Sequence, residues 1–90
     1  MANIKRYPFS LRKHAHDLEY RRNKAKNEMY DKDANGTLTE SERDAYENLI
    51  DDLARIISLY FPDSRGVVWL SGKEWALAHE SVLWAESMRG

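Results

Sequence analysis

Apolar residues recur at helical spacing in three parts of the chain. The clearest pattern runs through residues 39–60, where apolar side chains fall at steps of three and four and acidic side chains occupy the other side. The apolar positions of this stretch are Tyr46, Leu49, Ile50, Leu53, Ile56, Ile57 and Tyr60. A thinner apolar stripe crosses residues 11–30, and a third helical pattern covers residues 72–88. The periodicity therefore predicts an all-α fold with helices at about 11–30, 39–60 and 72–88.

The segments between these helices have their own signals. Residues 1–10 contain Pro8 and little periodicity, which predicts an irregular N-terminal arm before a single helical domain at 11–90. Residues 67–70 are apolar and β-branched, as in a short extended segment. Ser71 and Glu74 then have the spacing of a capping box, which marks the start of the third helix.

Composition narrows the class of protein. Ninety residues make one small domain, and the lack of cysteine excludes disulfides and thiolate metal sites. We expect a soluble cytoplasmic protein without membrane association, since no apolar run is long enough for a secretory or membrane-spanning segment. The net charge is only −1, but residues 1–30 hold eight Lys or Arg against three Asp or Glu, and residues 31–63 hold three against nine.

The strongest chemical motif lies in residues 31–42. Oxygen-bearing residues stand at positions 1, 3, 5, 7, 9 and 12 of this stretch, namely Asp31, Asp33, Asn35, Thr37 (through its carbonyl), Thr39 and Glu42. Gly36 occupies position 6, where a loop around an ion must turn sharply and a residue without Cβ does so most easily. A calcium ion takes six to eight oxygens, and this order of donors is the one that wraps around it.

This stretch resembles the calcium-binding loop of the EF-hand family, and Leu38 stands at position 8, where the family has an aliphatic residue. The resemblance implies a helix-loop-helix domain with Ca²⁺ as its cofactor. A fainter echo at 63–74, with Leu70 at its position 8, suggests a degenerate second loop. In that case a short two-stranded bridge is expected between residues 37–39 and 68–70. An ordinary polar turn is the alternative, because Asp, Asn and Gly are common between helices and Thr39 with Glu42 also forms a capping box.

A set of apolar residues near the C-terminus predicts a partner-binding surface. Leu77, Trp84 and Met88 lie on a second apolar face of the third helix, and Trp69 precedes that helix. The expected partner is another protein or a second copy of the chain. The basic segment Arg12–Lys26 is also compatible with nucleic acid, but the near-neutral pI of 6.3 argues against it.

Two functions follow from the sequence. The first is a small calcium-binding helix-loop-helix protein in which the ion orders two helices and which serves as a protein-interaction module. The alternative is a small inhibitor or adaptor, similar in profile to phage-encoded inhibitors of the anti-CRISPR type, that binds a larger protein or nucleoprotein assembly. In that case the ion loop is structural or vestigial. An enzyme is not expected, because the chain has no cysteine, three scattered histidines and no glycine-rich phosphate loop.

Overall fold

Three helices and a two-stranded sheet make up the fold. The computed structural model describes residues 5–89. Its elements are β1 (Tyr7–Ser10), α1 (Leu11–Ala34), α2 (Glu40–Leu59), β2 (Val67–Leu70) and α3 (Gly72–Arg89). The three predicted helices are confirmed, and the fold is mostly helical with a small sheet rather than all-α. Within residues 5–89, no helix has the length and apolarity needed to cross a membrane.

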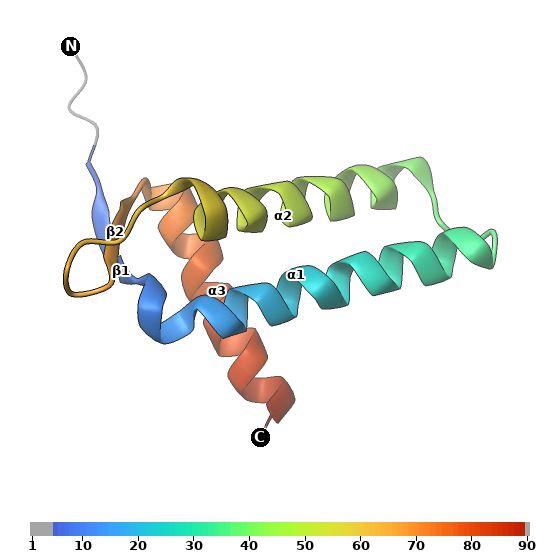
Figure 1. The fold of residues 1–90 in the computed structure, drawn as a ribbon. Helices are drawn as coiled ribbons and strands as arrows, with labels where there is room; N and C mark the ends of the chain where they lie inside the picture. Colours follow the sequence, from blue (N-terminus) through green and yellow to red (C-terminus); the bar gives the residue numbers. More distant parts are fainter. Residues whose placement is uncertain (1–4, 90) are drawn as a thin grey trace, which may run out of the picture.

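Helices α1 and α2 form a long antiparallel hairpin, and α3 crosses it near the end that carries the sheet (Figure 1). The main core lies where these elements meet, and Leu18, Leu53, Ile56 and Leu70 have no exposed surface there. A second, smaller cluster of Ala25, Met29 and Ile50 lies between α1 and α2. The outer half of the hairpin is therefore held together by two helices alone.

The sheet corrects two predictions. Strand β2 pairs antiparallel with β1, with Tyr7 opposite Leu70 and Phe9 opposite Val68, so no bridge joins residues 37–39 to 68–70. The physical reason is distance, since α2 is 20 residues long and separates the two segments by about 30 Å along its axis. Residues 7–10 of the predicted irregular arm are a strand, and residues 1–4 lie outside the described part of the chain.

The strand β1 tolerates a proline because of where its backbone groups point. The N–H and the carbonyl of Val67 both bond to Asp63, so at this residue the backbone groups of β2 point away from β1. Because the direction of these groups alternates along an antiparallel strand, those of Trp69 also point away from β1. Pro8 lies opposite Trp69, at a pair that exchanges no hydrogen bonds, and therefore needs no N–H. Phe9, the next residue, is buried in the main core and fixes β1 to it.

Candidate functional site

The tip of the α1–α2 hairpin contains the predicted ion loop. Helix α1 continues four residues beyond the predicted end, through Ala34, so Asp31 and Asp33 are helical. A Schellman motif then ends it: the Thr37 N–H donates to the Lys32 carbonyl at 2.9 Å and the Gly36 N–H donates to the Asp33 carbonyl at 3.1 Å. Gly36 has a φ of 70°. It thus provides the sharp turn predicted for it, but as the cap of a helix.

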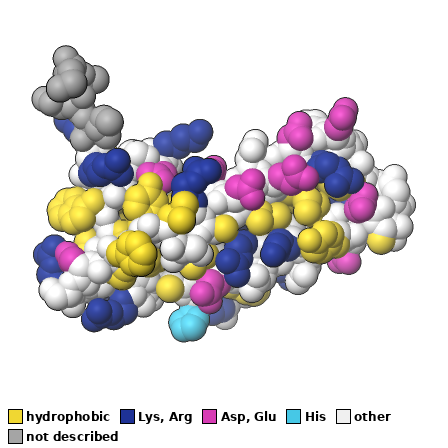
Figure 2. Space-filling view, turned by 45° about the horizontal axis from the view of Figure 1, so that its top comes forward, with side chains coloured by type: hydrophobic (Ala, Val, Ile, Leu, Met, Phe, Trp, Pro, Cys, Tyr) yellow, Lys and Arg dark blue, Asp and Glu magenta, His cyan; other side chains and the backbone are white. Residues whose placement is uncertain are grey.

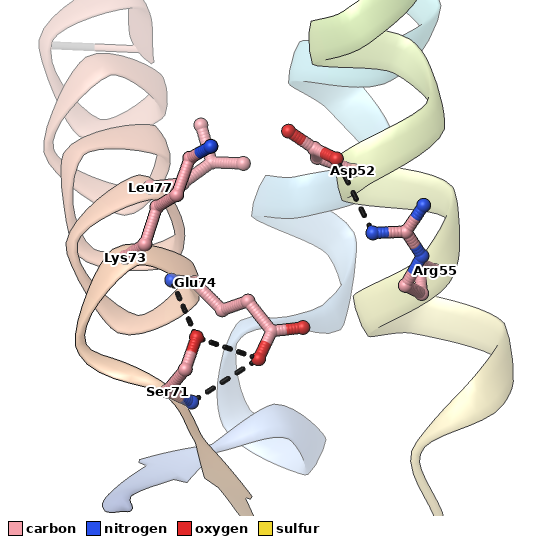
Figure 3. A pocket seen from close by; sticks show the side chains of 6 residues that line it. All are labelled: Asp52, Arg55, Ser71, Lys73, Glu74 and Leu77. Carbon is pink, nitrogen blue, oxygen red and sulfur yellow. Dashed lines mark hydrogen bonds and ion pairs between the residues drawn. The ribbon is translucent and has the colours of Figure 1, made fainter. Parts of the chain in front are cut away.

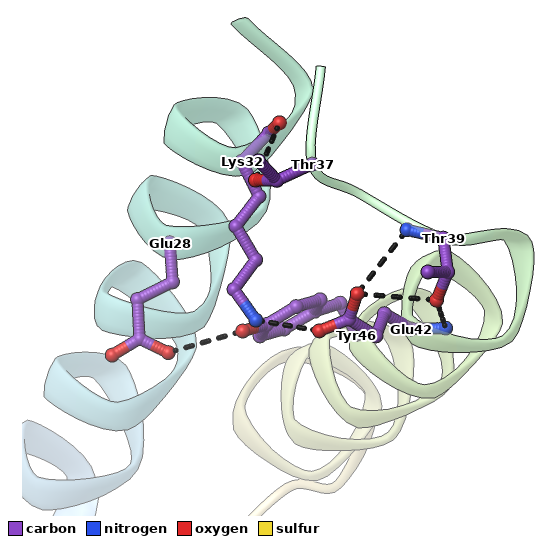
Figure 4. Close-up of polar contacts among 6 residues, drawn as sticks. All are labelled: Glu28, Lys32, Thr37, Thr39, Glu42 and Tyr46. Carbon is purple, nitrogen blue, oxygen red and sulfur yellow. Dashed lines mark hydrogen bonds and ion pairs between the residues drawn. The ribbon is translucent and has the colours of Figure 1, made fainter. Parts of the chain in front are cut away.

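Two ion pairs close this tip (Figure 4 shows the first). Lys32 Nζ lies 2.5 Å from Glu42 Oε2, and Arg43 Nη2 lies 2.8 Å from Asp33 Oδ1. The other oxygen of Glu42 accepts from the N–H and the hydroxyl of Thr39 at 3.2 and 3.1 Å, which completes a capping box at the start of α2. Two of the predicted ligands are therefore neutralised by cations of the same chain.

These contacts alter the protonation of both partners in the first pair. The hydrogen bond from Lys32, helped by those from Thr39, holds the pKa of Glu42 below its ordinary value. The same hydrogen bond with Glu42 raises the pKa of Lys32, although partial desolvation acts against it. Both side chains are thus charged over the whole neutral range.

The predicted ligands do not converge in this arrangement. Asp31 and Asp33 are two residues apart on a helix, so their side chains leave it about 200° apart. The Thr37 hydroxyl donates back to the carbonyl of Lys32 at 3.3 Å. Between residues 5 and 89, no three acidic or histidine side chains form a group that could hold a metal. As arranged here, Glu42 and Asp33 are paired with cations of the chain, and calcium binding stays a prediction.

The second predicted loop, at 63–74, consists of a turn, strand β2 and a helix cap. The Asp63 carboxylate accepts from the N–H groups of Arg65 and Val67, and ion-pairs with the Arg65 side chain at 2.9 Å. The Arg65 side chain and then these backbone donors hold the pKa of Asp63 below its ordinary value. Ser71 and Glu74 form the predicted capping box.

The four predicted partner-binding residues do not form one surface. Trp69 on β2 is 48% exposed and Met88 is 50% exposed, but they lie near opposite ends of α3, about 25 Å apart along its axis. Leu77 packs against the main core. Trp84 contacts α1, where its ring lies 5.4 Å from that of Tyr20. Leu77 and Trp84 line two different clefts, and Trp69 lies opposite Pro8 in the sheet.

A polar cleft of about 340 Å³ lies between α2 and α3 (Figure 3). Asp52 and Arg55 pair with each other across one helical turn at 3.5 Å on its α2 side. On its α3 side, Glu74 binds Ser71 and also accepts from the Tyr60 hydroxyl at 2.5 Å. Burial raises the pKa of Glu74, but these hydrogen bonds outweigh it and the net shift is downward. The side chains of Asp52, Arg55, Ser71 and Glu74 thus satisfy one another in pairs, as expected of a structural contact.

A groove that was not predicted from the sequence lies beside the sheet. It measures about 530 Å³ and is lined by Tyr7, Pro8, Gly72 and Trp75. The Trp75 indole N–H donates to the Pro8 carbonyl at 3.0 Å, and the His79 ring stacks on that of Trp75 at 4.9 Å. Pro8 and Trp75 are 67 residues apart in the chain. In the sequence, the only signals for this groove are the aromatic and proline residues themselves and Gly72.

Charge divides the molecule along its length. The sheet end carries Lys5, Arg6, Arg12 and Lys13 together with the acidic Asp63 and Glu74, whereas positions 31–47 toward the hairpin tip hold six acidic and two basic residues. Figure 2 shows basic side chains around an apolar patch at the sheet end and acidic side chains gathered toward the hairpin tip.

Comparison of the chain with protein-family models, curated proteins and solved structures gives no match. The function must therefore be argued from the geometry of the site.

Proposed function

We propose that this chain is a small protein-interaction module whose contact surface is the sheet end. The observation that carries the proposal is the groove formed by Tyr7, Pro8, Gly72 and Trp75, with the exposed Trp69 opposite Pro8 in the sheet. Pockets between rigid aromatic side chains are where binding energy concentrates in protein interfaces. The lining is mostly apolar, and the Trp75 N–H and the Pro8 carbonyl bond to each other, which suits binding rather than chemistry.

Rigidity supports the same proposal. The Trp75 ring is held by its hydrogen bond to Pro8 and by its stack on His79, so it loses little freedom when a ligand arrives. Strand β1 is anchored by Phe9 in the core and by its pairing with β2. A prearranged groove on a 90-residue scaffold is suited to an inhibitor or adaptor that docks on a larger protein or nucleoprotein assembly.

Capture of the partner from native cells tests this proposal. A tagged chain should co-purify a protein that is lost when Gly72→Val fills the groove and weakened by Trp69→Ala. Leu83→Ala is the matched control, because Leu83 is also exposed but lies on α3 outside the groove. Equal recovery of the same protein by wild type and Gly72→Val would rule out the sheet end as the contact surface.

Calcium binding at the hairpin tip is a second proposal. It is supported by the order of donors from Asp31 to Glu42 and by the positive φ of Gly36 at the turn. In this proposal the ion competes with Lys32 and Arg43 for the carboxylates of Glu42 and Asp33, so binding requires both ion pairs to open.

A further inference from the structure

We infer that the outward side of α1 binds double-stranded DNA, mainly through its phosphate backbone. This inference goes beyond the proposed function and uses a surface separate from the groove at the sheet end. Its support is the charge balance of residues 11–30, the direction in which their side chains leave the helix, and the strength with which a polyanion binds such a surface.

The cations of α1 have no ion-pair partners within residues 5–89. Positions 11–30 hold six of them, namely Arg12, Lys13, Arg21, Arg22, Lys24 and Lys26. The three carboxylates of the same stretch are all engaged. Asp17 pairs with Arg89, Glu19 lies 3.8 Å from the His16 ring, and Glu28 accepts from the Tyr46 hydroxyl at 3.4 Å. The positive charge of α1 is therefore left for an anionic ligand.

Four of these cations border one side of the helix. Lys24 and Lys26 leave α1 about 160° apart, and the amides of Asn23 and Asn27 lie in the arc between them. Ala25, which is buried in the smaller cluster, points in the opposite direction. The cations at this outward side are exposed or half-exposed: Arg12, Lys13, Lys24 and Lys26.

The acidic residues of α2 do not cancel this charge. Helices α1 and α2 lie side by side with the smaller cluster between them, so their outward sides face away from each other (Figure 1). Two helix diameters separate these sides by about 20 Å, which exceeds the screening length of about 8 Å at physiological salt. The pI of 6.3 averages over both sides and therefore hides a positive surface on one of them.

The strength of binding favours DNA over an acidic protein surface. Each phosphate that a lysine or arginine neutralises releases condensed counterions, and such contacts give non-specific dissociation constants of about 10⁻⁴ to 10⁻⁶ M. An exposed ion pair with a protein carboxylate strengthens binding by less than about fivefold, because both side chains lose freedom and salt screens them. Four exposed cations are thus used most effectively by a polyanion.

The layout of this side suits B-form DNA. The major groove is about 12 Å wide, close to the helix diameter of about 10–12 Å, so a helix along it has a phosphate strand at each border. Lys24 and Lys26 stand at those borders, and Asn23 and Asn27 lie between them, where an asparagine amide can pair with adenine. The major groove of duplex RNA is too narrow for side chains to read.

Single-stranded nucleic acid suits the same side less well. Single strands bind by stacking successive bases on aromatic rings. Of the two tyrosines on this side, Tyr20 packs its ring on that of Trp84 at 5.4 Å. Tyr30, which is 59% exposed, is then a single stacking platform.

Fluorescence anisotropy with a short labelled DNA duplex of mixed sequence tests the inference. Four phosphate contacts should give a slope of about −3.6 for log affinity against log salt, a loss of about 150-fold between 50 and 200 mM. Lys26→Gln should reduce that loss to about 40-fold, because one contact disappears. Lys73→Gln, which removes the same charge from the α2–α3 cleft, is the matched control and should keep the wild-type slope. The side-chain amide signals of Asn23 and Asn27 should shift in ¹⁵N NMR spectra.

Several results would overturn the inference. Equal effects of Lys26→Gln and Lys73→Gln would show that only net charge matters. A dissociation constant above about 1 mM at 50 mM salt would exclude the duplex as a ligand. Tighter binding of a single strand, of an RNA duplex or of polyglutamate would refute the assignment to DNA. Gly72→Val should bind the duplex as tightly as wild type, and weaker binding would place the DNA at the sheet end instead.

Discussion

Lys32 Nζ lies 2.5 Å from Glu42 Oε2 and thereby joins the last turn of α1 to the first turn of α2. Both residues belong to residues 31–42, the stretch in which the order of oxygen donors predicts an ion loop. The ammonium group of Lys32 balances the charge of Glu42. The hairpin tip is thus closed by the chain itself.

The pH dependence of this ion pair follows from the two pKa shifts. The pKa of Glu42 is lowered in the folded state. Its contribution to stability is therefore complete above about pH 4.5 and is lost as pH falls through the lower folded pKa. The pKa of Lys32 is raised in the folded state. Its contribution to stability is therefore complete below pH 10.5 and is lost as pH rises through the higher folded pKa. Thermal melts of wild type and Lys32→Gln should differ at neutral pH and converge at both extremes. A constant difference across the range would contradict this.

Calcium should compete with the same pair. If the tip binds the ion, calorimetry should detect heat of binding with wild type. Lys32→Gln should bind calcium more tightly, and Glu42→Gln should give no heat. The melting temperature should rise with calcium but not with chelator, because a ligand that binds only the folded state stabilises it. Magnesium should bind more weakly, since its octahedral shell resists a bidentate carboxylate. No heat at about 1 mM calcium with either wild type or Lys32→Gln would refute this site.

The three described glycines should respond differently to alanine. Gly36→Ala should cost about 1 kcal/mol, because φ is 70° there but nothing lies within 4 Å of the new Cβ. Gly66→Ala should cost about 3 kcal/mol, because φ is 79° and the Cβ would lie 2.4 Å from Cβ of Arg12. Gly72→Ala should be close to neutral. Urea denaturation measures the series, and an equal cost at Gly36 and Gly66 would contradict the clash with Arg12.

Core packing can be tested with two leucines. Leu53 is fully buried where α2 meets the main core, so Leu53→Ala should lower the free energy of unfolding by about 3 kcal/mol. Leu83 is 51% exposed, and Leu83→Ala should change the free energy of unfolding by less than about 0.5 kcal/mol. The comparison keeps the chemical change constant and varies only burial. Similar midpoints in urea for the two variants would show that α2 does not pack as described.

Local signals predicted most of the secondary structure. The apolar periodicity located the three helices, and the Ser71–Glu74 spacing predicted a capping box that is present. The Thr39–Glu42 capping box is also present, but it was the alternative to the predicted ion loop. The end of α1 was predicted four residues early, because the donors from Asp31 onward were interpreted as loop ligands. A glycine at position 36 is expected both in an ion loop and in a Schellman motif, since both require a residue with positive φ. The glycine alone therefore does not distinguish the two structures.

The amino-acid sequence by itself determined where helices begin, which faces are apolar and how charge divides between the ends of the chain, because these depend on neighbouring residues. Only the tertiary structure decided that β2 pairs with β1, that Trp75 binds Pro8 and that Lys32 and Arg43 neutralise the predicted ligands. Those pairings join residues 10 to 67 positions apart. Their partners are selected by which elements fit together in space, a choice that no local pattern contains.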